Sequence, residues 1–305
     1  MDFAALSGAG TAALASSSAV ALLSVAGRSI VRAGRPASRF DAIIMPEPGQ
    51  RARRDIVALE RRQALFATTS IVFIAVFLSA YLLVPSSRFE GMPTWQIIVA
   101  TAAGVAAIVW AAASLWRLTM ARRRLAFVRD AGIVVGQGLQ KLTGNQNRVF
   151  HDVPCGGLVL DNVVVGLHGI YAVYVIARRP GRHNKLRLRG DQLLFAPGDY
   201  RVALTPCIER SDLLARQLGK ALKISLRVRT VIAVPGWEIE AQPGDACLIV
   251  NERNLVMLRG WKNADEYLMH EDVKRLEELL TDRCTRYGRQ PEKSPVSFLV
   301  TPRTV

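Results

Sequence analysis

Two long uncharged segments constrain this chain more than any other feature. Residues 64–84 and 95–116 carry no charged side chain over 21 and 22 residues. A helix needs about 20 apolar residues to cross the hydrocarbon core of a membrane, where it satisfies its backbone hydrogen bonds internally. Trp95, Trp116 and Tyr81 lie near the segment ends, where interfacial aromatic residues are common. The sequence therefore predicts a hairpin of two transmembrane helices.

Basic residues flank this pair of segments on both outer sides. The arginines are Arg51, Arg53, Arg54, Arg61 and Arg62 before the first segment, and Arg117, Arg122, Arg123 and Arg124 after the second. The connecting residues 85–94 hold only one Arg and one Glu. Basic loops stay on the cytoplasmic side of a membrane. We therefore expect both flanks, and the domain that follows residue 124, to be cytoplasmic.

An apolar segment and a linker precede the predicted hairpin. Residues 3–27 are rich in Ala, Ser and Gly and lack the basic start of a secretory signal. They fit a third transmembrane helix, a surface helix or a disordered tail, and the sequence leaves these alternatives open. Residues 35–50 contain several Pro and Gly and are typical of a linker. The predicted organisation is an N-terminal region of residues 1–50, a membrane region 51–124, an α/β domain 125–288 and a tail 289–305.

The excess of basic residues extends beyond the membrane region. The 305-residue chain has a formal net charge of +15, and residues 121–305 hold 29 Lys and Arg against 19 Asp and Glu. This charge indicates nucleic acid, another polyanion or an anionic lipid surface as a partner, although Arg-rich usage is also typical of a high-GC genome. The four cysteines form no CxxC pair, which favours buried core thiols over a zinc site or a disulfide framework.

Hydrophobic periodicity in residues 131–287 alternates between helix and strand. Helices are expected at 131–144, 209–224 and 272–287, where apolar residues recur at helical spacing. Strands are expected at 149–153, 157–166, 170–177, 185–189, 230–234, 246–250 and 255–258. This order predicts a mixed β-sheet flanked by helices, which is an α/β fold.

Several local phrases in this region resemble the nuclease-related domain (NERD), a branch of the PD-(D/E)xK restriction-endonuclease-like superfamily. The phrases are Gly136-Gln137 on a helix, His151-Asp152-Val153 on a strand, the run from Leu160 to Tyr171, and Pro206 at the start of a helix. The resemblance covers residues 131–285 and is most specific at 160–171. It implies a restriction-endonuclease-like fold. In active members it also implies Mg²⁺-dependent cleavage of phosphodiester bonds by clustered carboxylates and a lysine.

The residues that this chemistry needs are mostly replaced in this chain. Asp161 alone keeps the catalytic residue type at its motif position, while Gln137, Tyr174 and Ile176 stand where the resemblance implies Glu, Glu and Lys. One carboxylate holds Mg²⁺ poorly, since this ion is bound by several hard oxygen ligands. The resemblance therefore implies an inactive nuclease without a cofactor, and Mg²⁺ is expected only if activity is retained. A local capping role is the alternative for Asp161.

The densest basic run begins after the third predicted strand and includes the fourth. It consists of Arg178, Arg179, Arg182, Lys185, Arg187 and Arg189. Strict alternation over 185–189 puts three cations on one strand face, where they can contact phosphates without reading sequence. A solvated strand or a lipid-facing patch is the alternative. Aromatic residues are not interleaved with these cations, which argues against base stacking on single strands.

Three functions are compatible with the sequence. The first is a multi-pass protein of the bacterial inner (cytoplasmic) membrane whose inactive nuclease-like domain binds nucleic acid or protein. The second is a structural or assembly subunit of a membrane complex in conjugation, secretion or phage defence, with other subunits as its partners. The third is an active metal-dependent nuclease with relocated carboxylates. The candidates for that relocated site are Asp152, Asp191, Glu238 and Glu240.

Overall fold

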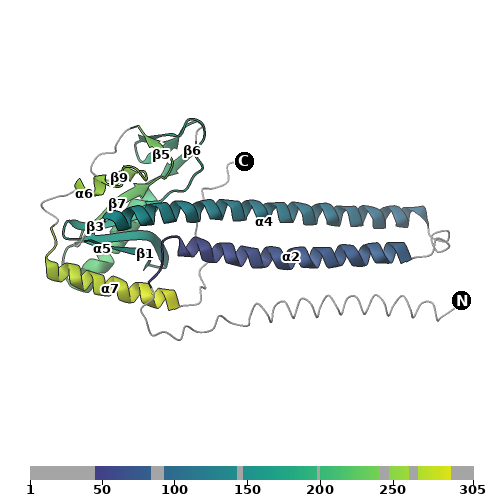
Figure 1. Cartoon of the computed structure of the whole chain (residues 1–305), viewed down its shortest axis with the longest axis horizontal. Helices are drawn as coiled ribbons and strands as arrows, with labels where there is room; N and C mark the ends of the chain where they lie inside the picture. The colour runs from purple at the N-terminus through teal and green to yellow at the C-terminus, as the bar shows by residue number, and fades with distance from the viewer. Residues whose placement is uncertain are drawn as a thin grey trace. The chain divides into compact units, whose positions relative to one another are not determined.

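The computed structural model describes residues 45–83, 93–142, 147–197, 200–240, 247–260 and 267–289 (Figure 1). The chain divides into two units, which are residues 1–41 with 55–124 and residues 42–54 with 125–305. The apolar segment 3–27, most of the loop 85–94 and nearly all of the tail 289–305 lie outside the described residues. Residues 45–54 belong to the second unit, although the sequence places them with the N-terminal linker and the membrane region.

Two long helices that contact each other build the described portion of the first unit. They are α2 (Gln50–Leu83) and α4 (Thr94–Leu142), of which residues 55–83 and 94–124 belong to this unit (Figure 1). The contacts between them are Gln63 Nε2 to Thr119 Oγ1 at 3.3 Å, Glu60 to Arg122 at 2.6 Å, and the edge-to-face rings of Phe66 and Trp110 with centroids 5.7 Å apart. The partners run in opposite order along the chain, so the two helices are antiparallel.

Both helices are longer than the segments that the sequence predicts. α2 includes the basic flank before residue 64, and α4 continues through residues 117–124 into the helix predicted at 131–144. Arg, Ala and Leu favour helix, and no Pro interrupts these stretches. Among the described residues, the stretch Thr101–Lys141 is long and apolar enough to cross a membrane, by length and composition, and 6% of its apolar window is buried. No second stretch of the described residues meets the same length and composition, so the two-helix membrane hairpin stays a prediction.

A five-stranded mixed sheet organises the second unit, with the strand order β1-β2-β3-β7-β9. Its strands are β1 (Asn147–Cys155), β2 (Leu158–Gly166), β3 (Gly169–Val175), β7 (Val228–Ala233) and β9 (Cys247–Val250). β1, β2 and β3 form an antiparallel meander, whereas β3, β7 and β9 are parallel. Every residue of β7 is buried, as is usual for a parallel strand covered on both faces.

Helices supply that cover. The end of α4 places Val135 and Leu139 against Val173 of β3 and Val231 of β7 on one face. The other face is covered by α5 (Thr205–Leu222) and α7 (His270–Arg289), whose buried side chains share one core cluster with β3 and β7. Both helices have one apolar side, so the helices predicted at 209–224 and 272–287 are confirmed with slightly different ends.

A four-stranded sheet with the order β6-β5-β4-β8 completes the second unit. Its strands are β4 (Lys185–Arg189), β5 (Gln192–Phe195), β6 (Tyr200–Ala203) and β8 (Glu238–Ile239). Leu186, Leu193 and Phe195 are buried in the same core cluster as α5 and α7. The sequence predicts β4 with its observed ends but none of the other three, because strands of two to four residues show too little alternation.

The expected α/β fold is confirmed as mixed sheets flanked by helices, with two sheets in place of one. The strand predicted at 255–258 is wrong, since α6 (Met257–Gly260) is a short helix. Asn251 gives the reason, because its side-chain oxygen accepts the N–H groups of Arg253 and Asn254 and turns the chain after β9. All four cysteines lie buried, in agreement with their prediction as core thiols.

Candidate functional site

Two aspartates face each other at a kink that β1 and β2 share. Asp152 of β1 has a left-handed backbone with φ of 52°, which a non-glycine residue seldom adopts. Asp161 of β2 occupies the corresponding place on the other strand, and the antiparallel register skips the two aspartates. The register pairs on either side are His151 with Asn162 and Val153 with Leu160. The kink therefore brings two carboxyl groups together that lie on separate strands.

Each carboxylate accepts a backbone N–H from outside the β1–β2 pair. Asp161 Oδ2 accepts the Val175 N–H at 2.8 Å, at the end of β3. Asp152 Oδ2 accepts the Arg51 N–H at 3.2 Å, in the first turn of α2. Sequence reasoning missed Arg51 because 101 positions separate it from Asp152. The two carboxylates thus tie three segments together: the kink, the end of β3 and the start of α2.

Burial dominates the titration of this pair. The pKa of Asp152 rises from 3.8 to about 7, because burial and then the neighbouring charge of Asp161 raise it by more than Arg51 and Arg54 lower it. Burial also raises the pKa of Asp161, against the Val175 hydrogen bond and the charges of Arg51 and Arg210. Two carboxyl groups so close to each other and so poorly solvated resist carrying two full charges.

A buried histidine lies beside the pair. His151 Nδ1 is 2.6 Å from Asn162 Oδ1, so the ring nitrogen carries the proton and donates it to the amide oxygen. Its Nε2 lies 3.5 Å from Gln140 Nε2 on α4 and is the acceptor in that contact. Burial lowers the pKa of His151, in spite of the Asn162 hydrogen bond. The imidazole is therefore neutral near pH 7 and joins β1, β2 and α4 as a polar core residue.

Tyr174 lies near Asp161, next to the Val175 N–H that the carboxylate accepts, but it is a core residue. Tyr174 is buried in the core cluster on the α5 side of the sheet, and Ile176 packs against that cluster. The Tyr174 hydroxyl lies 3.2 Å from Ser211 Oγ, which also accepts the Thr230 hydroxyl at 2.8 Å. Burial raises the pKa of Tyr174, so it stays a neutral phenol.

Gln137 lies on α4, which covers the other face of the sheet, and its side chain points away from the sheet. Its neighbours Val135 and Leu139 face β3 and β7, whereas Gln137 itself is exposed on α4. A side chain on the outer surface of α4 cannot meet Tyr174 across the sheet. The helix position that the resemblance implies for a catalytic Glu therefore lies outside the Asp161 environment.

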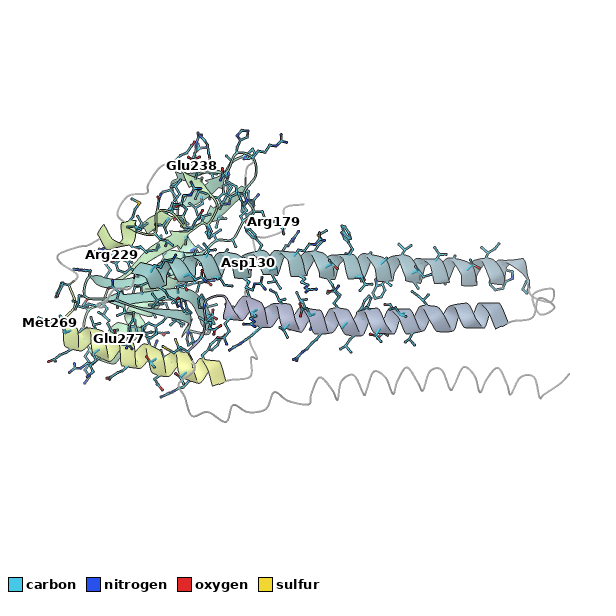
Figure 2. All side chains as sticks on the ribbon, in the orientation of Figure 1. Asp130, Arg179, Arg229, Glu238, Met269 and Glu277 are labelled. Carbon is cyan, nitrogen blue, oxygen red and sulfur yellow. The ribbon has the colours of Figure 1, made fainter. Side chains whose placement is uncertain are left out.

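The candidates for a relocated site are also dispersed. Asp191 Oδ2 accepts the Thr205 N–H at 3.2 Å and the Thr205 hydroxyl, and so caps the start of α5. Glu238 and Glu240 lie at β8 on the second sheet, where Figure 2 labels Glu238. Within the described ranges of the chain, no group of three or more His, Cys, Asp or Glu is close enough to hold a metal ion. Of these four candidates, Asp152 is the one that lies near Asp161.

The basic strand β4 is partly neutralised by its neighbour. Glu240 pairs with Lys185 at 2.8 Å and with Arg187. The hydrogen bonds from Arg187 and then Lys185 lower the pKa of Glu240 to about 2, so the carboxylate is charged throughout the physiological range. Two of the three strand cations predicted to contact phosphate thus share one anion, and Arg189 is exposed at the end of the strand.

The arginines before β4 pack against aromatic rings. The Arg178 guanidinium lies 3.7 Å from the Tyr200 ring centroid, and its carbonyl accepts the Trp237 indole N–H at 2.9 Å. The Arg179 guanidinium lies 5.8 Å from the Phe127 ring centroid. Such contacts stabilise packing by about 0.5–2 kcal/mol. Arg178 and Arg179 therefore contribute to the fold, whereas Arg182 is exposed.

Sequence reasoning missed one cation of this surface, Arg201. The strand register places Arg187, Leu194 and Arg201 in a row across β4, β5 and β6. Arg201 is exposed on the edge strand β6. The Pro-Gly-Asp sequence between β5 and β6 is a turn signal that could have revealed this hairpin.

The raised pKa of Asp152 predicts a pH dependence of stability. The folded chain binds the Asp152 proton more tightly than the unfolded chain does. The contribution of this proton to the free energy of unfolding is therefore complete below pH 3.8, and it is lost as the pH rises to about 7. Asp152→Asn removes the charge and keeps an acceptor for the Arg51 N–H. We expect this variant to be more stable than the wild type at pH 8, by roughly 1–3 kcal/mol, and to show a flatter pH profile.

Thermal unfolding of the full chain in detergent micelles between pH 5 and 8 measures this effect. Glu278→Gln removes a charge from the exposed side of α7 and should leave the profile of the wild type unchanged. A wild type that gains stability from pH 5 to pH 8 in parallel with the Asp152→Asn variant would contradict the assignment.

Comparisons with known proteins give no match to this chain. No protein-family model, no curated protein and no solved structure matches it. The resemblance of residues 160–171 to the nuclease-related domain therefore stays a prediction. The function of the chain has to come from the chemistry of its own residues.

Proposed function

We propose that this chain anchors a non-hydrolytic, nuclease-related domain at the inner membrane of a bacterium, where the domain binds nucleic acid. The observation that carries this proposal is the environment of Asp161. Its carboxylate accepts the Val175 N–H, and the neighbouring motif position, Tyr174, is buried with its hydroxyl next to Ser211. Both side chains hold the core together. Mg²⁺ needs several oxygen ligands, and Asp152 is the one further carboxylate at this place among the described residues.

The order of elements supports the resemblance to the nuclease-related domain. The end of α4 is followed by the β1-β2-β3 meander, then by the second-sheet strands β4, β5 and β6, by α5 and by β7, which pairs parallel with β3. Such a helix, meander, helix and parallel strand agree with the mixed sheet that the resemblance implies. Fold likeness is a weak guide to activity, so the proposal depends on the residues at the site.

The outer face of the second sheet is the proposed contact surface for phosphates. Arg189 and Arg201 are exposed, and Arg187 lies in the same register row as Arg201, two residues before Arg189 on β4. Glu240 offsets Lys185 and Arg187, which leaves a moderate rather than a high positive charge. A surface of this kind contacts the backbone of a nucleic acid without reading its bases.

The apolar side chains of α4 support a membrane anchor. The exposed ones are Trp95, Ile98, Val99, Val105, Ile108, Val109, Trp110 and Trp116. Soluble proteins rarely expose a continuous apolar surface of this extent, and acyl chains of lipid would cover it. The basic flanks then favour a cytoplasmic position for the α/β unit. A second span through α2 belongs to the same proposal, while a third span, a surface helix and a tail stay open for residues 3–27.

A structural or assembly subunit of a membrane complex, in conjugation, secretion or phage defence, is the second candidate. It is favoured by the internal use of the cations, since Glu240 binds Lys185 and Arg187, and Arg178 stacks on Tyr200. In that case the α/β unit binds another subunit, and its net charge is incidental. An active nuclease with relocated carboxylates has the least support, because Asp191 caps α5 at Thr205.

Salt-dependent binding of nucleic acid separates the first two candidates. We expect the full chain in detergent to shift double-stranded DNA or RNA on a gel at low salt. The double variant Arg189→Gln with Arg201→Gln should bind less tightly and with a salt slope smaller by about 2, since about two phosphate contacts are lost. Arg275→Gln on the exposed side of α7 is the control and should bind as the wild type does. Absence of binding at low salt would favour the assembly subunit.

The same preparation should not cleave either nucleic acid with Mg²⁺ or Mn²⁺. Cleavage that disappears in the Asp161→Ala variant would overturn the non-hydrolytic aspect of the proposal. Cleavage that persists in that variant would come from the relocated carboxylates of the third candidate or from a contaminating nuclease. Loss of this cleavage in the Glu238→Ala with Glu240→Ala variant would support the relocated site and would also overturn the non-hydrolytic aspect.

Retention in the membrane tests the anchor. We expect the chain to stay in the membrane pellet after an alkaline carbonate wash, and trypsin to reach the α/β unit in inverted vesicles but not in spheroplasts. Val105→Lys with Val109→Lys should weaken retention, because each lysine costs about 2.5–3.5 kcal/mol at the centre of a spanning helix. Release of the wild-type chain by the carbonate wash would contradict the anchor.

A further inference from the structure

The first turn of α2 takes one hydrogen-bond acceptor from a distant region of the chain. The initial N–H groups of any helix lack an acceptor within the helix. Here the Gln50 N–H bonds to the Glu47 carbonyl at 3.0 Å, and the Arg53 N–H bonds to the Gly49 carbonyl at 3.0 Å. The Arg51 N–H between them bonds to Asp152 Oδ2 of β1. A carboxylate of the α/β unit thus caps a helix that begins far from it in sequence.

The residues before this turn lie against the α/β unit. We call residues 45–51 the strap. Gly49 has a φ of 73°, and a Cβ atom built there would lie 3.0 Å from the Arg129 carbonyl of α4. Pro48 sits so close to Gly136 of α4 that a Cβ atom on Gly136 would collide with its ring. The strap therefore needs glycine on both sides of this contact, at Gly49 and at Gly136.

The left-handed backbone of Asp152 gives this contact a cost. The left-handed conformation of a non-glycine residue is about 1–2 kcal/mol less stable than an ordinary strand conformation. The carboxylate gains a bond to a helix N-terminus, where the helix dipole favours a negative charge by about 0.3–1 kcal/mol and more when partly buried. The strain at Asp152 is thus offset where the strap is in place, and it is not offset where the strap is absent.

We propose that Asp152 is a carboxylate latch that holds the strap and the first turn of α2 on the α/β unit. In the closed state the strap and the first turn of α2, residues 50–54, lie against the α/β unit beside the Asp152–Asp161 pair. In the open state the first turn of α2 frays, and the strap becomes a flexible tether that leaves the acid pair accessible to water. The latch would work whether or not the domain binds nucleic acid.

Hydrogen exchange and limited trypsin digestion of the full chain in detergent micelles test the latch. The first turn contains Arg51, Arg53 and Arg54, so fraying exposes three trypsin sites. We expect Asp152→Ala to increase both exchange of residues 50–54 and cleavage there by about tenfold or more, because the capping acceptor is lost. Asp152→Asn keeps an acceptor and should stay within about twofold of the wild type.

A glycine pair on α4 provides a second test that leaves Asp152 intact. Gly136→Ala displaces Pro48, whereas a Cβ atom on Gly132 lies 3.6 Å from the Gly49 Cα, which is ordinary contact. Both substitutions favour helix by the same amount, about 1 kcal/mol. We therefore expect Gly136→Ala to open the strap, as Asp152→Ala does, and Gly132→Ala to leave it closed.

Exchange in β7 serves as the internal reference. Unchanged protection of β7 together with faster exchange at residues 50–54 supports the latch. Wild-type protection of residues 50–54 in both Asp152→Ala and Gly136→Ala would overturn it. An equal increase of hydrogen exchange in β7 and in residues 50–54 would also overturn the latch. Asp152 would then stabilise the whole α/β unit rather than the strap.

Discussion

The parallel pair β3–β7 is buried on both faces, and this constraint organises the second unit. A sheet with two buried faces needs a helical layer on each, because its inward and outward side chains are both apolar. α5 and α7 form one layer, and the end of α4 forms the other through Val135 and Leu139. The helix that carries the apolar stretch Thr101–Lys141 is thus also a core element of the α/β unit. Any change that unwinds the end of α4 would uncover the sheet.

The two aspartates bond to backbone N–H groups from outside the β1–β2 pair. Asp161 bonds to the backbone of Val175 and Asp152 to the backbone of Arg51, so both contribute to holding segments together. A metal ion would compete with these bonds and would need additional oxygen ligands. Burial raises the pKa of both groups, which is a stability cost above neutral pH and a reason to expect a structural role.

The basic surface illustrates how local sequence misleads about charge. The run from Arg178 to Arg189 reads as a continuous cationic patch, but Arg178 stacks on Tyr200 and Glu240 binds Lys185 and Arg187. Tyr200 and Glu240 lie far from these cations in sequence. No short segment of the chain therefore shows that Glu240 offsets the charges of Lys185 and Arg187. Arg201 joins the surface for the same reason, since β6 reaches β4 only through β5.

Sequence alone determined the elements whose signal is local. The uncharged segments, the amphipathic α5 and α7 and the apolar runs of β2, β3, β7 and β9 each follow from a period that a few neighbouring residues define. The observed ends of β4 agree with its strict alternation for the same reason. Short strands such as β5, β6 and β8 escape this reasoning, because pairing with a neighbour rather than their own pattern makes them strands.

Tertiary structure alone decided where the local signals meet. The continuity of α4, the left-handed backbone of Asp152 and the bond from Arg51 to Asp152 depend on contacts between residues far apart in sequence. The placement of Tyr174 in the core and of Gln137 on the outside of α4 depends on which face of the sheet each element covers. A period along the chain specifies that a face is apolar, but the identity of the partner that buries it is set by packing.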